Sequence, residues 1–421
     1  MADVSGLEAY NVTQERLLYM SVFEKYNLRR VINARGPATV LGASKVSEKI
    51  RGEIDQMLGA NVQTWELQRR ASEWISKLTG APAGCVTGCT AAGLAVACAA
   101  SLTGCDPAKI KSLPEIKKGA KRKIIIQKGH VTGAGDAPIY QMVKMVGADY
   151  VEIGEALDCA TFHLREALDE DTAAALYILE STFAPNLLPL EVFVEICHEK
   201  NVPVIVDAAY LTDFKKLWEL KVDLATYSVQ KWLGGATAGI IAGRKDMVTA
   251  CYLQDLGIGR PMKSGKEGII SAIAAIDQWL RTDWDRIHAM QKEMADHLTN
   301  RLREVNGLSC SQEFSDYSPS LRLRMEVDSK KCGIPAWVLN DEIGRMDPEI
   351  KTDDYYANKG TLIFDFAYVD KEDVDIIADG IIKTITNHTE GGQKNIPAPR
   401  TRQDILYETM ARWLDGDPRE V

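Results

Sequence analysis

Short apolar runs rich in β-branched residues alternate with helical patterns along the chain from about residue 60. The runs that read as strands are 84–86, 124–126, 150–153, 174–179, 204–206, 223–227 and 239–243. Helical patterns separate several of them, as in Glu66–Leu78, where Leu67, Ala71 and Ile75 fall on one face. This alternation predicts an α/β fold with a mainly parallel sheet of about seven strands, covered by helices on both faces.

The remaining segments predict a second, smaller domain. A long helix over about 273–305 leads to strand patterns at 320–327 and 362–366, and a helical pattern covers 372–388. We expect an N-terminal arm over 1–55, a large domain over 56–275, a smaller α+β domain over 276–390 and a tail with a helix over 391–421. A chain of 421 residues is too long for one core, which agrees with this division.

Composition and charge narrow the class of protein. The chain is 46% hydrophobic and 26% charged, as in ordinary globular proteins. Its formal charge of −9 disfavours a nucleic-acid partner, because phosphate binding needs a basic face. The acidic opening residues do not read as a leader, and no apolar run approaches membrane-spanning length. We therefore expect neither a nucleic-acid nor a membrane partner.

The nine cysteines are odd in number and scattered, which is typical of free thiols in the cytoplasm. The spacing of Cys85 and Cys89 would suit one pair of ligands in a metal site. No second cysteine or histidine pair at ligand spacing accompanies them, so we expect no metal.

Lys231 lies in a turn of small residues between the runs 223–227 and 239–243. A lysine held at the end of a buried sheet loses hydration, which is costly unless the amine is used. The use that this position favours is a Schiff base with an aldehyde cofactor, pyridoxal phosphate. The alternative is a surface lysine in a hairpin loop.

Asp207 ends the apolar run 202–206, and ligands of open α/β sheets bind beyond the carboxyl ends of strands. A carboxylate in such a place is costly unless it faces a cation. The protonated pyridine nitrogen of the cofactor is such a cation, and the small Ala209 would leave room for the ring. The alternative is a loop or helix-capping aspartate.

A turn of small residues precedes the apolar helical pattern over 91–102. It comprises Gly88, Cys89, Thr90 and Ala91. Free N–H groups at a helix N-terminus form a seat for a phosphate, and Ser228 would add a second hydroxyl. Alone the signal is weak, because such turns are common and Ser228 can be a satisfied turn hydroxyl.

Two further strand ends carry polar candidates. His130 follows the run 124–126 and would stack on the cofactor ring or move protons, although a loop histidine without chemistry is the alternative. Ser181 follows the run 174–179 and would supply a hydrogen bond to the cofactor or the substrate.

A glycine-rich loop over 257–268 concentrates cations in an acidic protein. It follows no clear strand of a βαβ unit, which argues against a dinucleotide site. We expect Arg260, Lys263 and Lys266 to hold a substrate carboxylate or phosphate, and we assign Arg35 to substrate binding as well. The alternative is a solvated basic loop.

Five motifs occur in a familiar order: Val-Ile-Asn-Ala-Arg-Gly at 31–36, Lys-Gly-His at 128–130, Val-Asp-Ala-Ala at 206–209, Tyr-Ser-Val-Gln-Lys at 227–231 and the loop at 257–268. Over about 26–279 the chain resembles fold-type I pyridoxal-phosphate enzymes. The branch is that of selenocysteine synthase (seryl-tRNA selenium transferase) and D-glucosaminate-6-phosphate ammonia-lyase. The resemblance implies that Lys231 carries the cofactor, Asp207 pairs with its pyridine nitrogen and His130 lies over its ring. It places the phosphate on the turn at 89–91 and Ser228, and it implies at least a homodimer.

Within this branch, the tRNA-acting enzymes carry an extra N-terminal domain, whereas only about thirty residues precede Val31 here. We therefore expect a lyase that converts a β-hydroxy 2-amino acid to a 2-oxo acid and ammonia, with Lys231 or His130 removing the Cα proton. The expected substrate is an amino sugar acid such as D-glucosaminate or its 6-phosphate. A racemase or epimerase, a β-substituting transferase and a non-catalytic scaffold are the alternatives.

Overall fold

The structure is a computed structural model that describes residues 21–131, 138–179, 184–315, 318–390, 396 and 398–414. It divides into two compact units. The larger comprises 37–284 and 315–319, and the smaller comprises 1–36, 285–314 and 320–421. The domain limits expected from the sequence stay a prediction.

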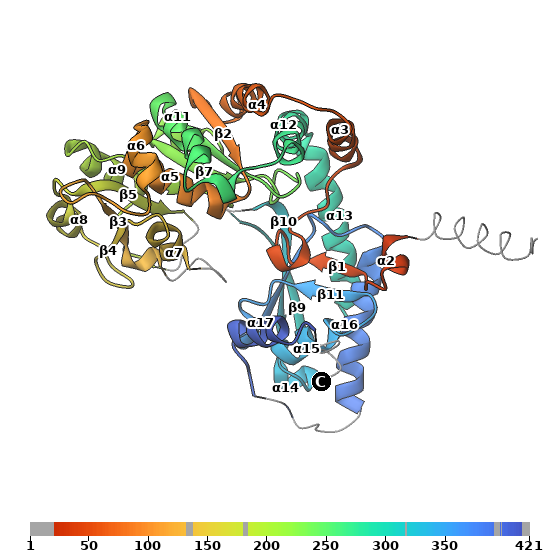
Figure 1. Ribbon diagram of the computed structural model, residues 1–421. Helices are drawn as coiled ribbons and strands as arrows, with labels where there is room; N and C mark the ends of the chain where they lie inside the picture. The colour runs from red at the N-terminus through yellow and green to blue at the C-terminus, as the bar shows by residue number, and fades with distance from the viewer. Residues whose placement is uncertain are drawn as a thin grey trace, which may run out of the picture. The chain divides into compact units, whose positions relative to one another are not determined.

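A seven-stranded sheet forms the centre of the larger unit (Figure 1). Its strands are β2 (Ala83–Thr87), β3 (Lys123–Gln127), β4 (Asp149–Ile153), β5 (Thr172–Ile178), β6 (Val204–Asp207), β7 (Leu224–Ser228) and β8 (Gly239–Gly243). They lie in the order β2-β8-β7-β6-β5-β3-β4, and β8 runs in the direction opposite to the other six strands. The predicted α/β fold with a mainly parallel sheet is confirmed.

Both faces of this sheet are apolar and covered by helices. Ile125 packs in the cluster on one face, and Ile124 and Ile126 pack in the cluster on the other, as the alternation of side chains along a strand requires. The first face carries α3 (Glu48–Leu58), α4 (Thr64–Thr79), α8 (Thr161–Ala167), α9 (Leu190–Glu199) and α12 (Lys266–Arg281). The second carries α5 (Thr90–Thr103), α7 (Ile139–Lys144) and α11 (Lys245–Leu253).

The long helix expected over 273–305 is instead two helices, α12 and α13 (Trp284–Leu302). Thr282 between them has an extended backbone, with φ −68° and ψ 128°, and its hydroxyl donates to the Gln278 carbonyl at 2.9 Å. The apolar periodicity continues through this position, so the break carries no hydrophobic signal.

The smaller unit contains a three-stranded sheet in the order β12-β10-β9 and a separate parallel pair. The sheet comprises β9 (Leu308–Ser315), β10 (Ser318–Val327) and β12 (Thr361–Asp365), and the pair comprises β1 (Val31–Ala34) and β11 (Glu349–Thr352). Its helices include α15 (Ala336–Ile343), α16 (Asp373–Glu390) and α17 (Arg402–Ala411). It has its own apolar core, which agrees with the smaller α+β part expected from the sequence.

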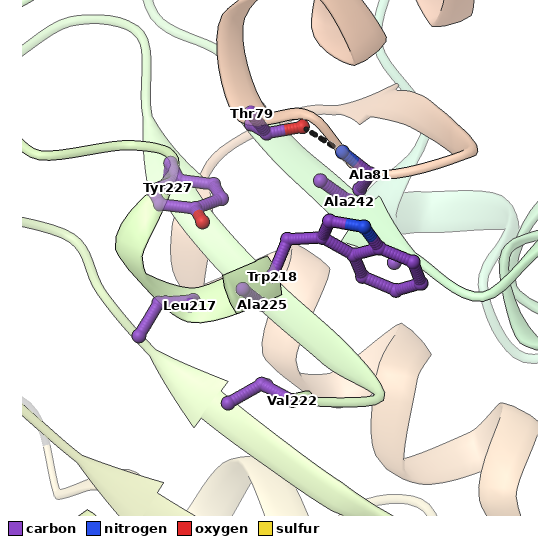
Figure 2. Close-up of a pocket in the computed structure, with 9 residues that line it drawn as sticks. Thr79, Ala81, Leu217, Trp218, Val222, Ala225, Tyr227 and Ala242 are labelled. Carbon is purple, nitrogen blue, oxygen red and sulfur yellow. Dashed lines mark hydrogen bonds between the residues drawn. The ribbon is translucent and has the colours of Figure 1, made fainter. Parts of the chain in front are cut away.

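A small cavity lies beside β7 and β8 towards the start of β7, lined mainly by apolar side chains that include Leu217, Trp218 and Ala225 (Figure 2). Lys231 follows the other end of β7, so this cavity is not the predicted cofactor site. Across the described ranges, no helix combines the length and the apolar character that crossing a bilayer needs.

Candidate active site

Lys231 and Asp207 lie at the carboxyl ends of two adjacent strands. Asp207 is the last residue of β6 and pairs with Thr226 of β7, and Lys231 comes three residues after β7 ends. The loop that carries Lys231 is tied internally, since the Gly234 N–H donates to the Lys231 carbonyl at 3.0 Å and the Val229 N–H donates to the Ala238 carbonyl at 3.0 Å. The structure therefore brings the predicted amine and acid to one edge of the sheet.

The Asp207 carboxyl has an environment suited to a cationic partner. Burial raises its pKa, whereas the charge of Lys231 and a hydrogen bond from the Ala209 N–H to Oδ1, at 3.1 Å, lower it. Desolvation is thus only partly offset within the chain. A pyridinium N–H at this carboxylate would supply the missing charge, and Ala209 lies in the same turn.

His130 is buried, with 2% of its surface exposed. It follows the end of β3, and β5 lies between β3 and β6, the strand that carries Asp207. Its Nδ1 accepts a hydrogen bond from the N–H of Ile178, at 3.3 Å, and Ile178 pairs with Asp207. Burial lowers the pKa of His130 to about 4, and the ring of Tyr177 packs against it at 4.4 Å. His130 is therefore neutral at pH 7, and because Nδ1 accepts, the proton lies on Nε2.

The turn before α5 is organised as a helix N-terminus. Cys89 is the N-cap, and its Sγ accepts from the Ala92 N–H at 3.4 Å. The Thr90 hydroxyl donates to the Tyr227 carbonyl at 3.2 Å, which ties the start of α5 to β7. Helical geometry leaves the N–H groups of Thr90 and Ala91 without an intrahelical acceptor, as a phosphate seat needs.

Gly239 shows how closely this turn approaches the sheet. A Cβ at Gly239 would lie 2.4 Å from the carbonyl carbon and oxygen of Cys89 and 2.7 Å from the Thr90 nitrogen. Gly239 pairs with Ser228, so that hydroxyl-bearing residue lies at the strand end nearest the turn. This edge of the sheet therefore presents an amine, a carboxylate and a helix N-terminus lined by hydroxyl groups. These three groups match, in that order, the aldehyde, the pyridine nitrogen and the phosphate of pyridoxal phosphate. The residues fit this cofactor.

The basic loop over 257–268 contacts the turn over 88–91, which is expected to hold the cofactor phosphate. The Gly88 N–H donates to the Met262 carbonyl at 2.8 Å, and Thr87 forms an antiparallel bridge with Lys263. Arg260 and Lys263 are exposed. Burial raises the pKa of nearby Asp255 and both cations lower it, so this acid, which the sequence did not suggest, is their counter-charge.

Three other residues were predicted to bind the substrate or the cofactor. The Lys266 ammonium donates to the carbonyls of Leu58, at 2.9 Å, and Ala60, at 2.5 Å, where it holds the C-terminal end of α3. Arg35 belongs to the smaller unit, where its charge offsets part of the rise that desolvation causes in the pKa of Asp353. Ser181 lies outside the described residues.

Tyr210 is a site residue that the sequence reasoning missed. Lys231 Nζ lies over its ring, 3.1 Å from the centroid. The available signal was an aromatic residue three positions after the strand-end Asp207.

Among the residues that the structure describes, no three histidine, cysteine, aspartate or glutamate side chains gather as a metal site.

Comparison with known proteins places this geometry in context. The sequence model of the L-seryl-tRNA selenium transferase family matches residues 66–292. The chain is 32% identical to a 5'-C-glycyluridine monooxygenase-decarboxylase from a Streptomyces species, over 80% of this chain and 84% of that protein. It is 27% identical to D-glucosaminate-6-phosphate ammonia lyase of Salmonella typhimurium, over 82% of this chain and 92% of that protein. A solved structure of D-glucosaminate-6-phosphate ammonia-lyase superposes with a TM-score of 0.79 at 26% identity, over 88% of this chain and 100% of that one.

Proposed function

The chain belongs to the L-seryl-tRNA selenium transferase family and depends on pyridoxal phosphate, and we propose that it is an ammonia-lyase acting on a β-hydroxy 2-amino acid. The substrate that we propose is an amino sugar acid, D-glucosaminate or its 6-phosphate. Loss of the β-hydroxyl and the Cα proton as water leaves an enamine, which takes up water and releases ammonia. The products are a 3-deoxy 2-oxo acid and ammonia, so the atoms balance without a further reactant.

The observation that carries the proposal is the meeting of Lys231, Asp207 and the start of α5 at one sheet edge. Lys231 would hold the aldehyde carbon of the cofactor, Asp207 its pyridine nitrogen, and the Thr90 and Ala91 N–H groups its phosphate. When bound, pyridoxal phosphate supplies an electron sink for the charge that develops at Cα.

Lys231 is the base that this arrangement favours. His130 is neutral, its Nδ1 accepts from Ile178 and its Nε2 carries the proton, so it has no free lone pair to take the Cα proton. It can instead donate from Nε2. Of the two bases expected from the sequence, we therefore retain Lys231, and His130 becomes a hydrogen-bond donor.

Arg260 and Lys263 are the groups that we propose for the anionic end of the substrate. Both are exposed cations on the loop bonded to the phosphate turn, and a phosphorylated sugar acid carries two anionic groups. A role for Arg35 in substrate binding and a role for Ser181 in binding the cofactor or the substrate remain part of this proposal. We also propose that the protein is a homodimer and that it is located in the cytoplasm.

The test is a substrate screen with protein reconstituted with pyridoxal phosphate, using Lys231→Ala as the matched control. D-glucosaminate and its 6-phosphate are incubated separately, and ammonia and 2-oxo acid are quantified. We expect the two products in equal amounts, no oxygen consumption and no turnover by Lys231→Ala. Exchange of the Cα proton in deuterated water without ammonia would contradict a lyase and indicate a racemase or epimerase.

A second candidate is an oxidative decarboxylase of a β-hydroxy amino acid. It is favoured by the 32% identity to the monooxygenase-decarboxylase, which exceeds the 27% identity to the ammonia lyase over similar coverage. Oxygen uptake together with release of carbon dioxide, in the same screen extended to a glycyl-nucleoside, would support this function in place of the lyase.

A further inference from the structure

Lys231 has an aromatic partner in addition to its acid. The Lys231 Nζ lies 3.1 Å from the ring centroid of Tyr210, within the range in which a cation is attracted to the face of an aromatic ring. Tyr210 follows the end of β6 by three residues, so the strand that places Asp207 also places this ring. The ammonium therefore has a π face and a carboxylate within reach.

The ring of Tyr210 is fixed at both ends. Its backbone follows β6, and its hydroxyl donates to the Pro37 carbonyl at 3.3 Å. The segment after Pro37 forms a short 3₁₀ turn (Thr39–Leu41) and then adopts positive φ at Gly42, 78°, and at Ala43, 64°. A non-glycine residue with positive φ persists only where its surroundings determine it, so this segment is a stiff support for the hydroxyl.

Two described groups near Lys231 interact favourably with an ammonium. Asp207 interacts electrostatically with it from β6, and the Tyr210 ring lies against its Nζ. His130, which is bonded to the strand neighbour of Asp207, is neutral and adds no opposing charge. A cation over an aromatic face is more stable than the neutral amine in the same place.

We propose that the face of Tyr210 is the seat of the protonated Lys231 side chain, which makes Tyr210 a positioning residue of the active site. Before the cofactor binds, the seat holds the ammonium beside Asp207. In the elimination, the same seat stabilises Lys231 after it has taken the Cα proton. This second part of the inference rests on the proposed function.

The test measures cofactor capture without substrate, so its outcome does not depend on whether the lyase assignment holds. The rate at which cofactor-free protein binds pyridoxal phosphate is followed by absorbance from pH 6 to pH 10. Because the neutral amine attacks the aldehyde, the midpoint of this profile reports the proton affinity of Lys231. Tyr210→Leu removes the ring, and Tyr210→Phe keeps the ring but removes the bond to Pro37.

We expect the midpoint of Tyr210→Leu to lie about one pH unit below that of the wild type, a tenfold loss of proton affinity. Tyr210→Phe should stay close to the wild type. Equal midpoints for Tyr210→Leu and the wild type would overturn the proposal, and so would an equal shift in Tyr210→Phe, which would assign the effect to the hydroxyl. If Tyr210→Leu does not fold, Tyr210→Met supplies a second ringless variant, and borohydride reduction verifies that Lys231 is the residue that captures the cofactor.

Discussion

At the scale of single residues, burial sets the protonation of the polar side chains at the candidate site. His130 is 2% exposed and stays neutral. Burial also raises the pKa of Asp207, and the nearby charge of Lys231 offsets this rise only in part. A neutral imidazole can donate a hydrogen bond, and a buried carboxyl of this kind is suited to a cationic partner such as a pyridinium nitrogen.

The low pKa of His130 predicts a pH-dependent stability. The pKa is about 4 in the folded protein and 6.5 in the unfolded reference, so the unfolded chain takes up the proton first as the pH falls. Stability from this group is present above pH 6.5 and is lost as the pH falls towards 4. Between pH 7.5 and pH 5 the wild type should lose about 2 kcal/mol of unfolding free energy that His130→Gln does not lose.

Urea unfolding of both proteins at the two pH values measures this difference. An equal pH dependence in His130→Gln and the wild type would show that the imidazole is not held neutral by burial.

At the scale of elements, the start of α5 depends on glycine in β8. An alanine at position 239 would place a methyl group 2.4 Å from the Cys89 carbonyl, so α5 must shift away from the strand. We expect Gly239→Ala to weaken cofactor binding at least about tenfold and to cost about 1–3 kcal/mol of stability. Cofactor titration and urea unfolding measure the two effects.

Gly52→Ala in α3 is the matched control. A Cβ at Gly52 meets no atom within 4 Å, so this change should leave cofactor binding intact and stabilise the helix slightly. If Gly239→Ala bound the cofactor as tightly as Gly52→Ala, the close contact of α5 with β8 would have no part in the site.

Lys263 precedes α12, whereas Lys266 is the first residue of that helix, and their contacts predict different roles. Lys266→Met removes two hydrogen bonds at the end of α3 and should cost about 1 kcal/mol of stability without raising KM. Lys263→Met, at an exposed position, should raise KM for a phosphorylated substrate and leave stability unchanged. Steady-state kinetics and urea unfolding of both variants distinguish these roles, and a raised KM in Lys266→Met would restore its predicted place in substrate binding.

The elements that the sequence predicted best are those with local signals. Parallel strands buried on both faces appear as continuous apolar runs, such as Ile124–Ile126, and strand ends locate Asp207 and Lys231 by the general rule for α/β sheets. The partners of Lys266 are about 200 residues away in the chain, and the seat of Lys231 on Tyr210 depends on the arrangement of two strands. Such long-range contacts have no local pattern.

At the scale of the whole molecule, the residues proposed to hold the cofactor come from the end of β6, from β7 and the loop that follows it, and from the start of α5, all in the larger unit. A ligand that bridges these elements stabilises the fold that brings them together. Each compact unit has its own core, so the effect should fall on the unfolding of the larger unit.

Removal of the cofactor should therefore lower stability measurably. At a free cofactor concentration of about one hundred times Kd, the holoprotein should be about 2.7 kcal/mol more stable than the cofactor-free protein. Asp207→Ala should reduce this gain at the same cofactor concentration, because its Kd rises. Thermal or urea unfolding with and without pyridoxal phosphate measures the gain, and identical curves for the wild type would contradict binding to the folded sheet.

The central claim is that Lys231, held at the edge of the sheet beside Asp207, is the amine that carries pyridoxal phosphate. Borohydride reduction of the reconstituted protein fixes the cofactor to its lysine, and peptide mass spectrometry then locates the label. We expect one labelled position, Lys231, with no label at any other lysine and none in Lys231→Ala. A label on a different lysine, or equal labelling of the wild type and Lys231→Ala, would contradict this account of the site.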